Sequence, residues 1–301
     1  MNQNTEQWKI TKNEVPSKKG IVASQHWIAS SLGADAMARG GNAIDAAIAC
    51  AFALNVVEPW MCGLGGSGYI LIWLAKSKEI KVIDFQGILP KNITLEDYPL
   101  DPEVPETIMG FPGVKNHENV LGYKSITVPG AVSGLCEALN KFGKLGIDSV
   151  LSKTIELADR GLPVDWYTTL QIAIEAEDLS KFTETSRVYL KNNFPPKPEQ
   201  YLKLGNLSKT LKRISENGPN EFYQGKLAQE IASDLQEGGS RITIEDLASY
   251  SFKYNDPLVA NYKNKTLYTA GENSGGMRLN EAFRFVEENL DRSIPFGPHA
   301  Y

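Results

Sequence analysis

The densest group of residues that could take part in chemistry is the segment Gly63-Leu64-Gly65-Gly66-Ser67-Gly68, in which four of six residues are glycine. Its spelling matches the G-x-G-x-x-G fingerprint of dinucleotide-binding folds, which follows a strand and opens a helix. In this chain the order is reversed, because a helical pattern precedes the glycines and a strand pattern follows them. We therefore predict no nucleotide site. The glycines are equally consistent with a tight turn between two layers and with backbone that lines a substrate cavity.

The serines of the glycine-rich segments and the cysteines do not lie in the sequence patterns of catalytic nucleophiles. Ser67 and Ser274 lack the G-x-S-x-G pattern of a hydrolase nucleophile elbow. The cysteines are odd in number and far apart, which disfavours a disulfide framework and a CxxC site; they are Cys50, Cys62 and Cys136. We expect small core residues, with a reactive thiol at Cys62 as the alternative.

The histidines and the first acidic residue of a helical pattern offer little support for catalysis. His26, His117 and His299 are isolated from one another, and the chain contains no H-E-x-x-H pattern, so no metal and no cofactor is predicted. Asp45 follows the good N-cap residue Asn42 by three positions, where a carboxylate meets the free N–H groups of a helix. We expect Asp45 to start a helix and not to act as a catalytic acid.

Composition excludes several classes of partner. The chain has 301 residues, 42% of them hydrophobic and 22% charged, as in ordinary globular proteins. Its net charge of -5 and the absence of basic clusters interleaved with aromatic residues predict no nucleic acid partner. The longest apolar run, residues 46–54, is too short to cross a bilayer, so no membrane span is expected. Residues 1–20 show no secretory signal, which leaves the compartment open, with the cytoplasm as the default.

The elements that must position these residues follow from periodicity and from glycine and proline breaks. We predict strands at 20–24, 69–74, 80–85, 251–254 and 258–269, and helices at 27–39, 42–57, 129–142, 148–160, 166–181, 207–217, 221–236 and 275–290. The proline-rich stretch 90–123 is expected to be an extended excursion, either a lid or a connector. This order indicates helices that cover one face of a sheet whose strands come from both ends of the chain.

Several segments, taken in order, resemble the γ-glutamyltransferase family. They are Gly40-Gly41-Asn42-Ala43-Ile44-Asp45-Ala46-Ala47, then Val57-Glu58-Pro59 with the glycine-rich segment, then residues 125–135, then Phe222-Tyr223-Gln224-Gly225 through Gly238-Gly239 with Thr243, Asp246-Leu247 and Tyr250, and finally Asn273-Ser274-Gly275-Gly276. Together they span about residues 20–290. Their common order is more specific than any one of them.

The resemblance implies an α+β fold of the N-terminal-nucleophile hydrolase type, an αββα sandwich that is incomplete in this chain and carries a helical insert. It implies that residues 1–301 form a single incomplete domain, the large portion of a precursor that cleaves itself. The N-terminal Thr of the small portion is then the nucleophile, its own α-amino group acts as base, and water or an acceptor amine resolves the acyl-enzyme. The implied activity is transfer or hydrolysis of γ-glutamyl groups, with glutathione as the usual substrate.

The resemblance places the chemistry outside this chain. The nucleophile, its supporting hydroxyl and the oxyanion-hole glycines are implied to lie beyond Tyr301, and the chain begins with Met1-Asn2, not with Thr. We therefore expect no catalytic residue within these 301 residues, a C-terminally truncated large portion that is inactive alone, and a nucleophile-bearing small subunit as its partner. A non-catalytic fragment that serves only as a binding or structural partner is the alternative.

One residue departs from the family pattern. The strand that ends at Asp84-Phe85 is implied to be followed by an Arg that pairs with the α-carboxylate of the γ-glutamyl group, but this chain has Gln86. A guanidinium forms charge-assisted bonds worth about 1.5–3 kcal/mol, whereas Gln offers only a neutral amide donor. We assign Gln86 to substrate binding. Three hypotheses remain for it: a polar strand end, a weakened glutamyl clamp, or a site reshaped for another acyl group, as in an acylase.

Overall fold

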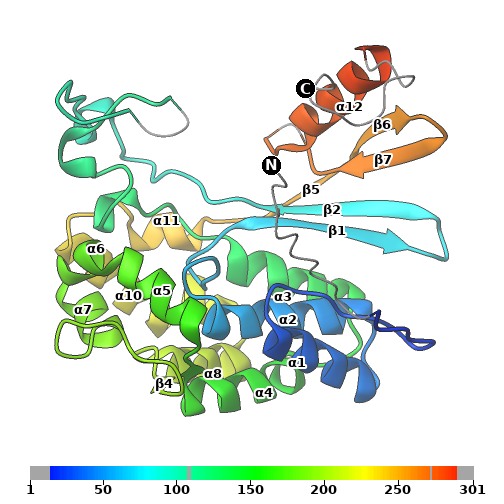
Figure 1. Ribbon diagram of the computed structural model, residues 1–301, viewed down its shortest axis with the longest axis horizontal. Helices are drawn as coiled ribbons and strands as arrows, with labels where there is room; N and C mark the ends of the chain where they lie inside the picture. The colour runs from blue at the N-terminus through cyan, green and yellow to red at the C-terminus, as the bar shows by residue number, and fades with distance from the viewer. Residues whose placement is uncertain (1–13, 107–109, 272, 290–301) are drawn as a thin grey trace, which may run out of the picture.

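The computed structural model describes residues 14–106, 110–271 and 273–289 (Figure 1). The helices are α1 (Trp27–Ala38), α2 (Ala43–Val57), α3 (Ala131–Phe142), α4 (Ile147–Arg160), α5 (Trp166–Ile174), α6 (Ala176–Ser180), α7 (Thr183–Tyr189), α8 (Leu207–Asn217), α9 (Asn220–Tyr223), α10 (Lys226–Glu237), α11 (Ile244–Ala248) and α12 (Gly276–Asn289). The strands are β1 (Gly68–Leu74), β2 (Glu79–Phe85), β3 (Leu162–Pro163), β4 (Tyr201–Leu202), β5 (Lys253–Asn255), β6 (Leu258–Tyr262) and β7 (Lys265–Thr269).

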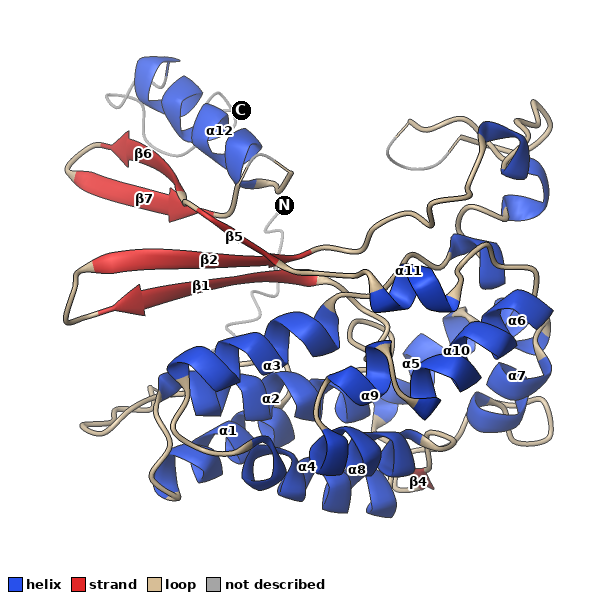
Figure 2. Ribbon diagram, turned by 180° about the vertical axis from the view of Figure 1, so that it is seen from behind, coloured by secondary structure: helices blue, strands red, loops and turns tan. Residues whose placement is uncertain are grey.

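The main sheet joins strands from both ends of the chain. Its order is β1-β2-β5, and both pairings are antiparallel. Figure 2 shows α1 to α4 on one side of this sheet, and the hairpin β6–β7 followed by α12 on the other. The helices form the main core, because α2 packs on α1, α3 and α4 while α3 contacts β1 and β2. The predicted arrangement of helices over one face of a sheet built from both chain ends is confirmed.

The main sheet has one covered face and one open face. Ile72 in β1 is 3% exposed and belongs to the core beneath the sheet. Its neighbours Leu71 and Trp73 are 42% and 57% exposed, because successive side chains of a strand point to opposite faces. Because Ile72 faces the helical core, Leu71 and Trp73 lie on the opposite face, on the side where Figure 2 shows the hairpin β6–β7. We call it the outer face of the sheet.

Helix α2 begins as its sequence predicts. The Asn42 side chain accepts from the Ile44 and Asp45 N–H groups, and the Asp45 carboxylate accepts from the Asn42 N–H at 2.7 Å. Asp45 is fully buried, because it also accepts from the N–H groups of Lys144 and Leu145 between α3 and α4. The prediction that Asp45 starts a helix is confirmed, and the residue also ties α2 to the α3–α4 connection.

The proline-rich excursion is closed by a narrow neck. Ile88 and Val128 exchange two backbone hydrogen bonds, of 3.2 and 2.8 Å, just after the chain leaves β2 and just before it enters α3. A Cβ atom on Gly87 would overlap the Thr127 hydroxyl, so the neck permits only glycine there. Between these ends the described residues form loops and short 3-10 turns, as the prolines predict.

Several sequence predictions need correction. The helix predicted at 221–236 is divided into α9 and α10 by Gln224 and Gly225. Residues 20–24 form no strand, because no neighbouring strand pairs with them and Ser24 instead bonds to the His26 carbonyl oxygen and to Ser30. The helix predicted at 166–181 is divided into α5 and α6 at Glu175, the residue between them. The patch 258–269 is two strands, β6 and β7, with a turn between them. Helices α7 and α11 were not predicted; each is only one or two turns long, too short for a clear period.

None of the helices in the described ranges combines the length and apolarity needed to span a lipid bilayer. The last predicted helix, 275–290, corresponds to α12, and its final residue lies outside the described residues.

Candidate functional site

The glycine-rich loop, residues 63–68, lies between α2 and β1. A hydrogen bond of 3.0 Å from the Gly66 N–H to the Gly63 carbonyl oxygen closes it into a turn. The Gly66 carbonyl oxygen then accepts from the N–H groups of Gly130 and Ala131, at 3.0 and 2.9 Å. The predicted tight turn is confirmed, and it is joined directly to the beginning of α3. Whether this backbone also lines a substrate cavity stays a prediction.

The end of β2 approaches α3 so closely that only glycine fits between them. A Cβ atom on Gly130 would overlap both the Phe85 carbonyl oxygen and the Tyr250 hydroxyl. A Cβ atom on Gly134 would overlap the Phe85 ring, and one on Gly68 would lie 3.0 Å from the same ring. Three segments that carry the family resemblance therefore meet around Phe85: the glycine-rich loop, the 125–135 segment and Tyr250.

Gln86 follows this packed residue, and its backbone is held on both sides. Its N–H donates to the Asp84 carboxylate at 3.0 Å, and its carbonyl oxygen accepts from the Tyr250 hydroxyl at 3.0 Å. The side-chain amide of Gln86 is half-buried and forms no hydrogen bond with another described residue. The structure thus fixes the peptide of the predicted binding residue and leaves its amide group available to a ligand.

The outer face beside Gln86 carries further polar groups. Asp84 is 9% exposed, and its second carboxylate oxygen accepts from the Asn255 side-chain amide at 3.1 Å. Tyr69 pairs with Asp84 across β1 and β2. The Tyr69 hydroxyl is buried without a hydrogen-bond partner among the described residues. Burial, assisted by the negative charge of Asp84, raises the pKa of Tyr69, so this hydroxyl is a donor at neutral pH.

Tyr250 is held by a second tyrosine. The rings of Tyr223 and Tyr250 are stacked with centroids 5.5 Å apart and planes 13° from parallel. The Tyr223 hydroxyl donates to the Pro129 carbonyl oxygen at 2.9 Å and accepts from the Ser133 N–H at 3.1 Å. Burial, together with the charge of Asp84, raises the pKa of Tyr250 to about 12, which keeps its hydroxyl protonated as the donor to Gln86. The pair connects α9 and the first turn of α3 to the end of β2.

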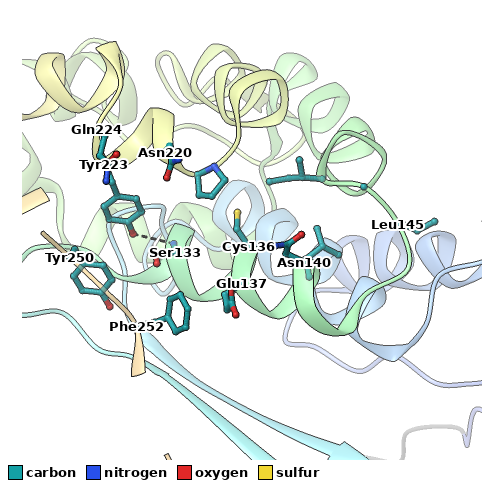
Figure 3. A pocket seen from close by; sticks show the side chains of 14 residues that line it. Ser133, Cys136, Glu137, Asn140, Leu145, Asn220, Tyr223, Gln224, Tyr250 and Phe252 are labelled. Carbon is teal, nitrogen blue, oxygen red and sulfur yellow. Dashed lines mark hydrogen bonds between the residues drawn. The ribbon is translucent and has the colours of Figure 1, made fainter. Parts of the chain in front are cut away.

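A cavity of about 440 Å³ lies behind this tyrosine pair, on the helical side of the sheet. Figure 3 shows Ser133, Cys136 and Glu137 of α3 among its lining residues, with the Tyr223 hydroxyl bonded to the Ser133 N–H. Tyr250 closes the end nearest to Gln86. The cavity and Gln86 therefore share Tyr250 as a common wall.

The two histidines that the structure describes, His26 and His117, are not arranged for nucleophilic catalysis or metal binding. His26 precedes α1, and its Nδ1 accepts from the Ile28 N–H at 3.2 Å, while burial lowers its pKa. His117 lies in an exposed turn of the excursion, and His299 falls outside the described residues. Across the described ranges, no group of three or more His, Cys, Asp and Glu side chains is placed to hold a metal ion.

The cysteines behave as core residues and not as nucleophiles. Cys50 and Cys136 are buried, as predicted, and Cys62 is partly buried beside the glycine-rich loop. Burial raises the pKa of the Cys62 thiol, and the negative charge of Glu58 acts in the same direction. The thiol is therefore protonated at neutral pH, which argues against the alternative of a reactive Cys62.

Known proteins are similar to this chain in both sequence and fold. Residues 29–295 match the family model described as gamma-glutamyltranspeptidase. A glutathione hydrolase proenzyme of Bacillus subtilis subsp. natto is 34% identical over 274 residues, which are 90% of this chain and 45% of that protein. The acylase ACY 1 proenzyme of Pseudomonas sp. strain SE83 is 33% identical over 95% of this chain and 51% of its own length. The Helicobacter pylori gamma-glutamyltranspeptidase structure superimposes with a TM-score of 0.85 and 29% identity, over 95% of this chain and 79% of that one.

These matches, together with the mixed α+β architecture, place the chain among the N-terminal-nucleophile hydrolases in fold. More narrowly, the chain belongs to the gamma-glutamyltranspeptidase family. It spans about half the length of the curated relatives that it matches.

Sequence reasoning singled out Gln86, whose role stays a prediction, but not the groups around it. Tyr223 and Tyr250 lie in the matching segments without an assigned role, and Tyr69 and Asn255 were not singled out. Strand alternation over residues 84–86 could have placed Asp84 with Gln86 on one face. Nothing local in the sequence shows that Tyr250, 164 residues away, bonds to the Gln86 carbonyl oxygen.

Proposed function

We propose that this chain is the large portion of an enzyme that transfers or hydrolyses γ-glutamyl groups, with glutathione and related γ-glutamyl amides as substrates. The observation that carries the proposal is the family match over residues 29–295. The names of relatives, glutathione hydrolase proenzymes among them, support both the activity and synthesis as a precursor. Gln86, with its free side-chain amide, is the residue of this chain that we assign to substrate binding.

The proposed nucleophile is an N-terminal Thr supplied by residues outside this chain. Its hydroxyl attacks the γ-carbonyl carbon, its α-amino group takes the hydroxyl proton, and the leaving amine receives a proton as the amide bond breaks. Water or an acceptor amine then attacks the acyl-enzyme and releases the Thr. The role left to this chain is to bind the acyl group near the end of β2, where Gln86 and the glycine-rich loop are fixed by backbone hydrogen bonds.

The nucleophile-bearing portion is proposed to complete an αββα sandwich against the outer face. Leu71 and Trp73 leave apolar surface on the main sheet, at 42% and 57% exposure. Val259 and Tyr268 do the same on the hairpin β6–β7, at 58% and 44% exposure. Exposed apolar faces with unpaired strand edges favour further strands as their partner.

The test is expression of the full-length gene product, followed by assays with glutathione and L-γ-glutamyl-p-nitroanilide. We expect two bands after self-cleavage, release of p-nitroaniline, and no turnover by residues 1–301 alone. Self-cleavage without release of either γ-glutamyl product contradicts the proposed substrate. Turnover by the isolated 301 residues contradicts the proposed origin of the nucleophile.

A second candidate is an acylase-like amide hydrolase with a different acyl group. Two observations favour it: Gln86 stands where the resemblance implies an arginine, and a relative of 33% identity is an acylase proenzyme. A panel of p-nitroanilides with glutamyl, glutaryl and uncharged acyl groups separates the two candidates. Preference for the glutaryl or an uncharged acyl group supports the acylase, and preference for glutamyl supports the first proposal.

A further inference from the structure

Lys253, the first residue of β5, lies on the outer face beside Gln86. It stands opposite Asp84 in the antiparallel register. The next residue, Tyr254, points to the helical side, where its hydroxyl bonds to Glu137 on α3 at 2.6 Å. Asn255 points to the outer face, where its amide bonds to Asp84. Because side chains alternate along a strand, Lys253 shares the outer face with Asn255 and Asp84.

Lys253 is within reach of the Gln86 amide. Gln86 is two residues beyond Asp84, so it is the diagonal neighbour of Lys253, and diagonal neighbours are accessible to long side chains. The ladder ends at Asp84, but the hydrogen bond from Tyr250 to the Gln86 carbonyl oxygen keeps the two strands adjacent beyond that point. The flexible four-carbon stem of lysine allows its ammonium group to turn toward either Asp84 or Gln86.

The donors on this part of the outer face have no acceptors of their own. Lys253 is exposed and forms no ion pair with any described residue, including Asp84. The Gln86 side-chain amide and the buried Tyr69 hydroxyl also lack partners there. Asp84, by contrast, already accepts from the Gln86 N–H and the Asn255 amide. A cation and a neutral amide donor on one face of the sheet are suited to a ligand carboxylate.

We propose that Lys253 is a specificity-determining residue, which binds the carboxylate of the acyl substrate together with the Gln86 amide. The cation for carboxylate recognition thus comes from β5 and not from the residue after β2. This inference rests on the proposed function and deepens it, because it predicts an anionic acyl group in spite of Gln86. It also explains why an exposed lysine is placed opposite Asp84 without forming an ion pair with it.

The test compares Lys253→Met, Lys253→Arg and a matched control, Lys76→Met, in the full-length gene product. Lys76 is an exposed lysine in the turn between β1 and β2, far along the strands from Gln86. The two substrates are L-γ-glutamyl-p-nitroanilide and its α-carboxamide analogue, which lacks only the negative charge. For Lys253→Met we expect KM for the carboxylate substrate to rise roughly 10- to 100-fold, the size of one charge-assisted hydrogen bond.

The remaining results follow from the same contact. Lys253→Met leaves the α-carboxamide substrate within about twofold of its original kcat/KM, because that substrate makes no charged contact. Lys253→Arg retains most of the activity toward the carboxylate substrate, and Lys76→Met changes neither substrate. An equal fall in kcat/KM for both substrates, with a lower Tm, shows instead that Lys253 only neutralises Asp84, and this result overturns the inference. An unchanged KM for the carboxylate substrate also overturns the inference.

A binding measurement keeps the inference separate from turnover. Calorimetric titration with L-glutamate is expected to show binding to the original protein and at least about tenfold weaker binding to Lys253→Met. If the enzyme cleaves neither anilide but binds glutamate through Lys253, the proposed reaction fails and the carboxylate site stands. If the enzyme cleaves the glutamyl anilide and Lys253→Met binds glutamate unchanged, the proposed reaction stands and the carboxylate site fails.

Discussion

Substitution of Gly130 by Ala tests the close approach of β2 and α3. The added Cβ would overlap the Phe85 carbonyl oxygen and the Tyr250 hydroxyl. Neither obstruction moves easily, because one is strand backbone and the other belongs to a ring stacked on Tyr223. The Gly130 backbone itself accepts alanine, since its φ of -109° and ψ of -18° lie in an ordinary region. The effect is therefore steric, and overpacking of this kind costs about 1–3 kcal/mol.

Gly65 provides the matched control within the same site. A Cβ atom there meets nothing within 4 Å, and its φ is not positive. Gly65→Ala is expected to be neutral or to stabilise by up to about 1 kcal/mol, because alanine restricts the unfolded chain. The two variants should thus differ in free energy of unfolding by about 1–4 kcal/mol. Urea unfolding followed by circular dichroism measures this difference.

A double variant tests which atoms are responsible. Tyr250→Phe removes the hydroxyl but keeps the ring stack, so Gly130→Ala combined with Tyr250→Phe should recover part of the lost stability. The carbonyl oxygen of Phe85 remains, so recovery is incomplete. Equal stability of Gly130→Ala and Gly65→Ala would refute the close approach, and additive effects of Gly130→Ala and Tyr250→Phe would refute the assigned contact.

Two further predictions concern titratable groups. Because burial raises the pKa of Cys62, iodoacetamide should modify this thiol more slowly than a free cysteine at pH 7.5, and the rate should still rise above pH 9. Mass spectrometry of the labelled peptide measures the rate of modification. Fast labelling at neutral pH would contradict a protonated Cys62 thiol. Burial lowers the pKa of His26 below its ordinary 6.5, so the unfolded chain binds a proton there more tightly than the folded protein does. The free energy of unfolding should therefore fall as the pH drops through and below 6.5. Urea unfolding at several pH values should show a shallower fall for His26→Gln; an identical slope in the variant excludes His26 as its cause.

Local chemistry made part of the fold predictable. Asn42 and Asp45 start α2 as their spacing predicts, because capping involves groups only three residues apart. The hairpin β1–β2 was predicted from two β-rich runs joined by a polar turn. The helix predicted over 166–181 is interrupted at Glu175, where two short helices meet in the structure and propensity gives no warning.

The sequence allowed one residue of the candidate site to be proposed, but not the contacts around it. Gln86 was identified because it departs from a family pattern, whereas its environment depends on long-range contacts. Tyr250 reaches it across 164 residues and Asn255 reaches Asp84 across 171. Contacts of this kind follow from how α3 and β5 dock on β2, which no local periodicity encodes. The strand predicted at 20–24 failed for the same reason, because a strand requires a partner that the sequence alone does not reveal.

The neck formed by Ile88 and Val128 gives the molecule a convenient point of modular change. Both ends of the excursion are joined to each other there, and within it the Lys91 N–H donates to Asp246 and Asp97 pairs with Arg241. Doubling a flexible loop costs only about 0.6 kcal/mol. Changes in loop length that keep the contacts to Asp246 and Arg241 should therefore cost little stability, and the peptide of Gln86, two residues before Ile88, should keep its place.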